Sequence, residues 1–149
     1  MALFDARVGH PEIDPQHQAM LSYLAELGSR AEGGDAGGTA VVLNGLWGET
    51  VSHFALEEDL MGSSSYPERH AHRTAHQLFL QDVQGLKRLL EQRGPDEEFA
   101  TRLKRIAEWF AYHVETNDRP LAHFLSRRTA ARAAGAVDLP GGGSRRSDA

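Results

Sequence analysis

The chain has 149 residues, of which 40% are hydrophobic and 25% charged, and this length and composition predict one globular domain followed by a tail. The formal net charge of −5 argues against a nucleic-acid partner, and the absence of cysteine excludes disulfides, thiolate zinc sites and iron–sulfur clusters. Because no apolar run is long enough for a membrane span and the first residues lack the pattern of a secretory signal, we expect a cytoplasmic protein without a membrane partner.

The first part of the chain predicts an extended arm followed by two helices. Residues 1–13 lack helical periodicity and are expected to form the arm. Asp14 and Pro15 then predict a helix start, with Asp14 as the N-cap and Pro15 at the first helical position. The apolar stripe of this helix ends at the glycine-rich residues 33–38. A second amphipathic helix is expected over about residues 39–61.

Two further amphipathic helices are predicted, one over about residues 67–92 and one that starts at Pro95. Four such helices with short connections predict an all-α, antiparallel up-down four-helix bundle. From about residue 129 onward the chain is rich in Ala, Gly, Arg and Ser, which predicts a disordered C-terminal tail. The expected division is therefore a bundle domain over residues 1–128 and a tail over residues 129–149.

Histidine and carboxylate side chains interrupt the apolar stripes of all four predicted helices. H-x3-E and H-x3-H spacings place two side chains four residues apart, so both members of each pair point to the same side of a helix. Imidazole and carboxylate groups are ligands of iron, zinc and manganese, and seven of them are enough to hold two metal ions. The candidate metal ligands are His17, His53, Glu57, His72, His76, His113 and Asp118.

A single histidine on an apolar stripe is usually a core residue with satisfied hydrogen bonds. This set differs because every stripe carries a histidine and the second adds Glu57, a residue type that is almost never fully buried unless it is paired. Metal ions would satisfy all of these polar groups together. We expect His10, His70 and His123 to lie outside the site. Glu58 is turned by about 100° from Glu57 on a helix and is expected to be solvated.

Asp118 follows His113 by five residues, which places it about 140° away from the face of His113 on an ideal helix. For both side chains to reach one site, the helix must end, widen or bend between them. Pro120 is tolerated in the first turn of a helix. We therefore expect the fourth helix to end and a short C-terminal helix to begin near Asn117 or Asp118.

The ligand pattern and its surroundings resemble the hemerythrin family over roughly residues 8–126, and a single domain of this length is similar to the bacterial hemerythrins. All seven ligand positions are present. The chain departs from the family at Phe4, where members often have Trp, and at Pro120, which is less usual after the aspartate. The similar motifs are I-D-P-Q-H at residues 13–17, H-F-A-L-E-E at residues 53–58, and Trp109 four residues before His113.

The resemblance implies a non-heme centre of two iron ions with an oxo or hydroxo bridge. It gives three histidines to one iron, two histidines to the other, and two bridging carboxylates to both. One iron then has six ligands and the other five, which leaves an open position for O2, with NO and small anions as further ligands. The implied ligands are His72, His76 and His113 for the first iron, His17 and His53 for the second, and Glu57 and Asp118 as bridges.

This interpretation predicts a monomeric protein that binds O2 reversibly, as a carrier or store, and that is not an enzyme. Di-iron oxidases use carboxylate-rich sites with Glu-x-x-His pairs, whereas imidazole dominates here and no additional acid or base is evident on the inward stripes. Phe54, Trp109, Phe110 and Val114 are candidates for an apolar wall around the site, or for plain core. The alternatives are a di-iron enzyme that detoxifies nitric oxide or peroxide, an oxygen- or redox-sensing module, and a manganese or zinc pair.

Overall fold

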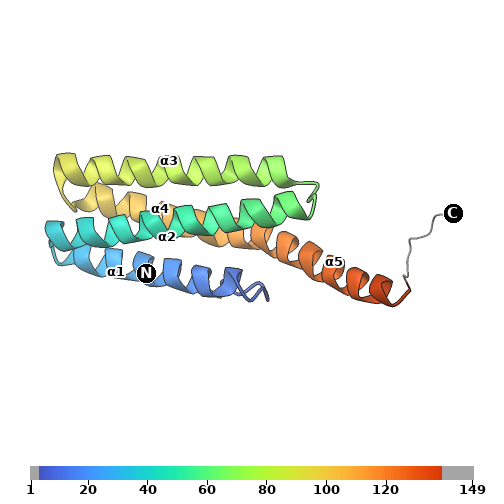
Figure 1. The fold of residues 1–149 in the computed structure, drawn as a ribbon. Helices are drawn as coiled ribbons and strands as arrows, with labels where there is room; N and C mark the ends of the chain where they lie inside the picture. The colour runs from blue at the N-terminus through green and yellow to red at the C-terminus, as the bar shows by residue number, and fades with distance from the viewer. Residues whose placement is uncertain (1–3, 139–149) are drawn as a thin grey trace.

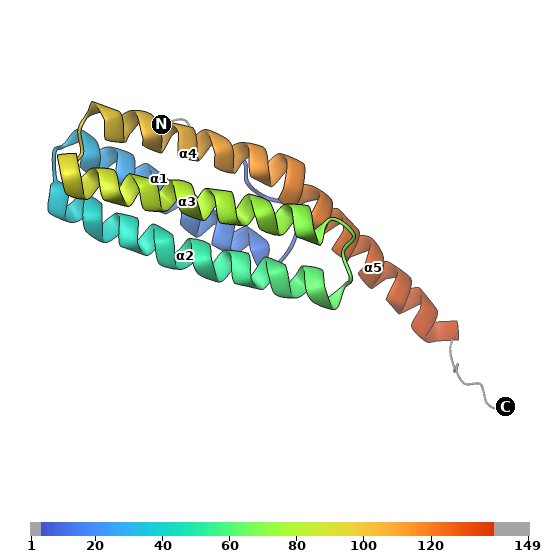
Figure 2. The ribbon, with the colours of Figure 1, turned by 90° about the horizontal axis from the view of Figure 1, so that it is seen from above.

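The computed structural model describes residues 4–138, and these residues form a bundle of long helices (Figure 1). Seen from above, α1 to α4 lie side by side and α5 extends from one end of the bundle (Figure 2). The predicted all-α, antiparallel four-helix bundle is confirmed. No helix within residues 4–138 combines the length and apolarity that a bilayer crossing requires. The elements are α1 (Ile13–Glu32), α2 (Ala36–Ser63), α3 (Arg69–Arg93), α4 (Glu97–His113), the π-helical turn η1 (Val114–Asp118) and α5 (Arg119–Asp138).

The N-terminal arm is fastened to the start of α1 by two side chains. The Asp14 carboxylate accepts hydrogen bonds from the backbone N–H groups of Val8 and Gly9, at 2.7 and 3.1 Å. Asp14 is therefore not the N-cap that the sequence predicted, because its side chain turns back toward the arm and away from the helix start. His10 takes a capping role instead, since its Nδ1 accepts the N–H of Ile13 at 3.3 Å.

The larger apolar core lies toward the α1–α2 and α3–α4 connections. Its side chains come from all four helices, and the largest are fully buried. A second, smaller apolar cluster of Met61, Tyr66 and Leu121 lies at the base of α5, and the polar residues of the stripes lie between the two. The core includes Met20, Leu24, Leu27, Leu46, Phe79, Leu86, Phe99, Leu103 and Phe110.

The helix widens between His113 and Asp118 and does not end there. The π-helical turn η1 follows α4 directly and continues into α5, so the predicted change in the helix between the two residues is a widening. α5 begins at Arg119, next to the predicted start near Asn117 or Asp118, but without the expected break. Extra residues in the turn rotate Asp118 back toward the face of His113. Pro120 has no N–H to donate and lies just after the turn, where the hydrogen-bond ladder changes register, so the helix accommodates it without a break.

The C-terminal helix is longer than the sequence predicted. α5 runs through Asp138, so residues 129–138, which were expected to belong to a disordered tail, are helical. Alanine and arginine have high helix propensities, and the composition that indicated a tail also favours a helix. The rest of the predicted tail, residues 139–149, lies outside the described residues. A domain boundary at residue 128 stays a prediction.

Candidate metal centre

All seven predicted ligands meet at one place inside the bundle. Each is at most 1% exposed to solvent, so the cluster is closed off from water. The i, i+4 spacing on α2 and on α3 places both members of each pair on the inward face, as the helical period requires. α1 supplies His17, α2 supplies His53 and Glu57, α3 supplies His72 and His76, α4 ends with His113, and η1 ends with Asp118.

The cluster divides into two groups that share both carboxylates. In each group, one nitrogen or oxygen from every member lies within 4.8 Å of those of the others. This division is the one implied by the family resemblance. The first group contains His72, His76 and His113, and the second contains His17 and His53, while Glu57 and Asp118 belong to both.

Glu57 directs one oxygen to each group. Its Oε1 lies 3.2 Å from His72 Nε2 and 3.0 Å from His76 Nε2. Its Oε2 lies 3.4 Å from His53 Nε2, on the other side. A carboxylate in this position can bridge two ions through its two oxygens.

Asp118 repeats this arrangement from the opposite side of the bundle. Its Oδ1 lies 3.0 Å from the Nε2 atoms of both His72 and His113. Its Oδ2 lies 2.9 Å from His17 Nε2 and 3.9 Å from His53 Nε2. The π-helical turn is what allows this, since it brings Asp118 to the same site as His113.

Several of these inward atoms have no hydrogen-bond partner, which tests whether the donor set fits a cation. Glu57 Oε2, His113 Nε2 and Asp118 Oδ1 are buried and unpartnered, and such a group costs about 1–3 kcal/mol. His113 Nε2 and Asp118 Oδ1 lie 3.0 Å apart but lack hydrogen-bond geometry. His17 Nε2 and His53 Nε2 face each other at 3.1 Å. Metal ions would bind these lone pairs together, so the residues fit a metal centre.

The outer nitrogens of the two-histidine group are fixed by hydrogen bonds. His17 Nδ1 donates to the backbone carbonyl of Ala6 at 2.8 Å, and His53 Nδ1 donates to the side-chain oxygen of Gln16 at 2.8 Å. Donation from Nδ1 leaves the Nε2 lone pair directed into the site, which is how metal-ligating histidines are usually oriented. The sequence interpretation missed both partners. Gln16 lies beside His17 in the I-D-P-Q-H motif, which was the available signal.

Glu58 performs the same function on the three-histidine side. The sequence predicted a solvated residue, yet its Oε2 accepts a hydrogen bond from His76 Nδ1 at 3.0 Å, and its side chain is 36% exposed. Arg73 also lies near it, with 3.8 Å between Arg73 Nε and Glu58 Oε1. Because Glu58 follows Glu57 by one residue on α2, its side chain points away from the inward face of the helix. It points toward α3 instead, where its carboxylate reaches the outer nitrogen of His76.

Burial and neighbouring charges set the protonation of the metal-free cluster. Burial, followed by the charges of His72 and His113, lowers the pKa of His76 to about 2. Burial also acts to lower the pKa of His72, but hydrogen bonds and charge from Asp118 and Glu57 outweigh it and raise this pKa to about 9. Burial and the nearby Asp118 charge raise the pKa of Glu57 well above its ordinary value. The metal-free centre therefore retains protons at neutral pH that a metal must displace.

Aromatic rings cover the outer faces of the ligand imidazoles. The ring of Phe54 stacks on His76 with 3.8 Å between centroids and 9° between planes. Trp109 stacks on His113 at 4.8 Å and 10°, and Phe110 lies edge-on to a third ligand ring at 5.4 Å. These side chains belong to the core and also touch the site directly. The structure is therefore compatible with both functions considered from the sequence, an apolar wall around the site and ordinary core packing.

The three remaining histidines do not join the cluster. His70 and His123 are exposed on the surface of α3 and α5. His10 caps the start of α1, as described above. Within residues 4–138, the seven predicted ligands thus account for both potential metal-binding groups.

Comparison with known proteins adds an independent finding. The family model described as "Hemerythrin HHE cation binding domain" matches residues 8–125. The "Bacteriohemerythrin" of Stenotrophomonas maltophilia (strain R551-3) is 32% identical over 120 residues, which cover 79% of this chain and 76% of that protein. The "Bacteriohemerythrin" of Pseudomonas aeruginosa (strain LESB58) is 31% identical over 115 residues, covering 76% and 73%. A "Hemerythrin-like protein" of Naegleria gruberi is 27% identical over 111 residues, covering 74% and 81%.

Proposed function

This chain belongs to the hemerythrin family, and on that premise we propose that it binds O2 reversibly at a non-heme centre of two iron ions, as a carrier or store. One observation carries the proposal. The two buried carboxylates, Glu57 and Asp118, each direct one oxygen to the three-histidine group and the other to the two-histidine group. Two bridging carboxylates between unequal sets of imidazoles favour a pair of ions with different coordination.

The proposed ligands divide in the same way. The imidazole and carboxylate donors suit iron, and two ferrous ions would supply the two electrons that O2 takes up on binding and returns on release. The group with two histidines provides one protein ligand fewer, so we assign the position for O2 to that side. In this proposal His72, His76 and His113 hold one iron, His17 and His53 hold the other, and Glu57 and Asp118 bridge them.

The surrounding residues favour binding over catalysis. Apart from the seven proposed ligands, the buried side chains with a polar atom within the described residues are Thr39, Thr50, Ser64 and Tyr66. The three aliphatic hydroxyls are not general acids or bases of the kind that a di-iron oxidase would use, and burial raises the pKa of the Tyr66 phenol, whose ring packs with Leu121 and Phe124 at the base of α5. Phe54 and Trp109 stack on ligand rings and exclude water, which slows the loss of electrons from the ferrous state.

An optical experiment tests the proposal. The protein is loaded with Fe(II) without oxygen, its spectrum is recorded, and the measurement is repeated in air and again after O2 is removed. We expect charge-transfer bands that appear with O2 and disappear on its removal, in protein that contains two irons per chain. Irreversible oxidation after one exposure would contradict O2 carriage. Steady-state consumption of nitric oxide or peroxide would favour the enzyme alternative.

A further inference from the structure

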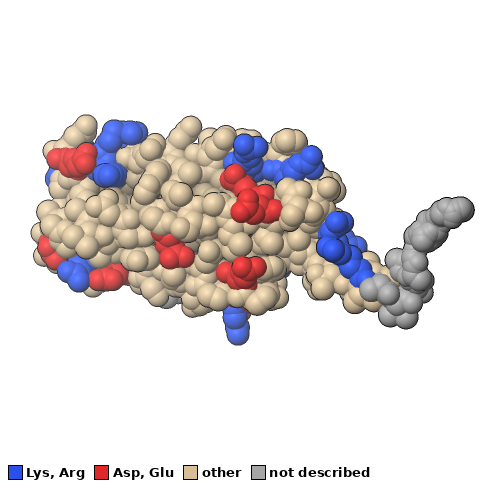
Figure 3. Space-filling model, in the orientation of Figure 1, with Lys and Arg blue, Asp and Glu red and all other residues tan. Residues whose placement is uncertain are grey.

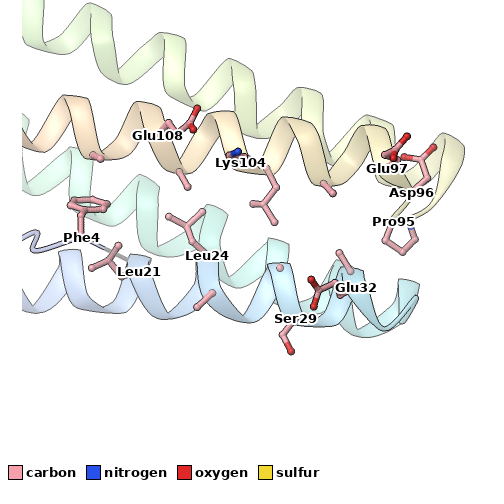
Figure 4. A pocket seen from close by; sticks show the side chains of 17 residues that line it. Phe4, Leu21, Leu24, Ser29, Glu32, Pro95, Asp96, Glu97, Lys104 and Glu108 are labelled. Carbon is pink, nitrogen blue, oxygen red and sulfur yellow. The ribbon is translucent and has the colours of Figure 1, made fainter. Parts of the chain in front are cut away.

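A groove of about 910 Å³ runs between α1 and α4, in the half of the bundle remote from α5 (Figure 4). Its floor is made of large apolar side chains, and its walls are mostly small residues, so the backbones of α1 and α4 are accessible to a closely packed partner. The apolar floor consists of Phe4, Leu21, Leu24 and Leu103, and the small wall residues are Ala25, Gly28, Ala100, Ala107 and Ala111.

The rim of this groove is acidic. Four carboxylates line it against a single lysine, Lys104, one on the α1 side and three on the α4 side (Figure 4). One of the four, Asp96, is already engaged, since it forms an ion pair with Arg93 at 3.0 Å and accepts a hydrogen bond from the N–H of Phe99. An occupant with positive charge and a narrow apolar face would therefore fit the groove better than a neutral or acidic one. The carboxylates are Glu32 on α1, Asp96 in the α3–α4 connection, and Glu97 and Glu108 on α4.

The projecting part of α5 has those properties. Residues 126–134 are all exposed, and they include three arginines and no acidic residue. On a helix, Ala130, Ala131 and Ala134 share one side, which Arg127 also joins at its N-terminal end, and Arg128 and Arg132 share another side. In Figure 3 the blue atoms of basic residues mark α5 where it leaves the bundle, and no red atoms appear on the coloured part of it in this view.

The base of α5 is fixed, so the helix projects in a defined direction. Leu121 and Phe124 pack against Met61 and Tyr66, with 5.0 Å between the rings of Tyr66 and Phe124. α5 is also continuous with η1 and leaves the end of the bundle opposite to the Pro95 end of the groove (Figure 2). The helix of one molecule therefore cannot turn back into its own groove.

In place of the monomer expected from the sequence, we propose that α5 of a second copy of this chain occupies the α1–α4 groove. The helix fits within the groove, since at about 1.5 Å per residue residues 126–134 span about 13 Å, while the groove spans about 17 Å along α1 and about 23 Å along α4. The charges are complementary, with three arginines on the helix against Glu32, Glu97 and Glu108 and one lysine on the groove, apart from Asp96, which pairs with Arg93. Small residues on both surfaces permit close helix packing.

The arrangement closes as a two-fold dimer. The groove and α5 lie at opposite ends of one bundle, so an antiparallel pair of bundles places each α5 beside the groove of the other molecule. An isologous pair of this kind has no unused docking surface and does not grow into a filament. The match to the family model ends at residue 125, so the projecting helix lies outside the matched residues, and none of the seven proposed metal ligands belongs to the docking surfaces.

Two charge-reversal variants test this dimer in the iron-loaded, full-length protein. The first carries Arg127→Glu, Arg128→Glu and Arg132→Glu on α5, and the second carries Glu32→Arg, Glu97→Arg and Glu108→Arg on the groove. Molecular mass is measured by sedimentation and by light scattering over a wide range of protein and salt concentrations. We expect a wild-type dimer that salt weakens, and a dissociation constant raised on the order of a hundredfold in each variant.

The decisive experiment mixes the two variants. In a heterodimer both contacts are complementary again, acidic α5 in basic groove and basic α5 in acidic groove, so an equimolar mixture should form a dimer although neither variant does so alone. The control reverses Lys87, Arg88 and Arg105, exposed residues of α3 and α4 outside the groove lining, and should stay dimeric. A wild-type monomer at every concentration, or a dimer that survives both reversals, would overturn the proposal. Circular dichroism and iron content confirm that each variant is folded.

Discussion

His76 Nδ1 donates a hydrogen bond to Glu58 Oε2 over 3.0 Å, and this bond joins a fully buried ligand to a carboxylate at the protein surface. On the other side of the centre, His53 donates to the neutral side chain of Gln16. A carboxylate partner makes an imidazole a stronger electron donor than an amide partner does. The two proposed irons therefore differ in the polarity of their outer partners as well as in their number of histidines.

Loss of this carboxylate should weaken metal binding although Glu58 is not a ligand. We expect Glu58→Ala to lower iron affinity by about tenfold to a hundredfold. Glu58→Gln should lower it less, because an amide oxygen can still accept the hydrogen bond from His76. Iron retained during competition with a chelator measures the effect. Asp59→Ala, a neighbouring exposed carboxylate, is the control, and an equal loss of iron in that variant would argue for a general charge effect.

Replacement of Glu57 should be more damaging than replacement of Glu58. Glu57 faces both histidine groups, so Glu57→Ala removes a ligand from each proposed ion and leaves uncompensated positive charge in a buried site. We expect this variant to lose most of its iron, whereas Glu58→Ala retains iron at saturating concentration. Metal analysis after anaerobic loading checks the ranking. Equal iron contents in the two variants would count against Glu57 as a bridge.

Small anions should bind the diferric protein at a single position. We expect azide to shift the charge-transfer bands and to saturate at one anion per di-iron centre, because in the proposed assignment only the two-histidine side has an open position. His113→Ala should reduce iron loading itself, since that residue is a proposed ligand of the other ion. His70→Ala provides the control, because the residue is exposed and outside the cluster. Loss of the anion-dependent bands in His70→Ala, but not in His72→Ala, would refute the ligand assignment.

Metal uptake by the metal-free protein should release protons. The pKa of His72 is raised to about 9 and that of Glu57 is raised well above its ordinary value, so both groups compete with protons for the metal near neutral pH. Affinity should accordingly rise as the pH increases from about 6.5 toward 9. Titration with zinc, which is redox-inactive, in buffers of different ionisation enthalpy measures the protons released. An affinity that does not change over this interval would contradict the protonation of the metal-free centre.

Truncation after Arg128 should separate the two proposals. The residues that anchor α5, Leu121 and Phe124, remain in the shortened chain. We therefore expect unchanged iron content and O2 spectra, together with a loss of dimer. Sedimentation and optical spectra of the same sample report both properties. A truncated chain that fails to bind iron would show that the outer part of α5 supports the bundle.

Helical periodicity was sufficient to predict the four helices of the bundle and six of the seven clustered polar residues, whereas Asp118 lies about 140° off the face of His113 on an ideal helix and needed the expected change in the helix and the family resemblance. Pairs such as His53 and Glu57 are fixed by local spacing, so the helix alone aligns them. The partners Gln16 and Glu58 were not predicted, because their contacts depend on how two helices pack and on which rotamers they adopt. The continuous helix through Pro120 was missed because a π-helical turn leaves no clear compositional mark.

The π-helical turn η1 also makes the chain sensitive to a change in its length. Deletion of one residue between His113 and Asp118 would leave the two ligands four residues apart, the spacing that an ordinary α-helix places on one face, so the aspartate could stay at the centre. Insertion of one residue would instead rotate everything after it by about 100°, so Asp118 would leave the centre and α5 would project in another direction, although each of the four bundle helices could still form. A frame-preserving gain of a single codon in this segment would therefore be more damaging than most substitutions there, because one short stretch of backbone sets both the register of a ligand and the direction of the projecting helix.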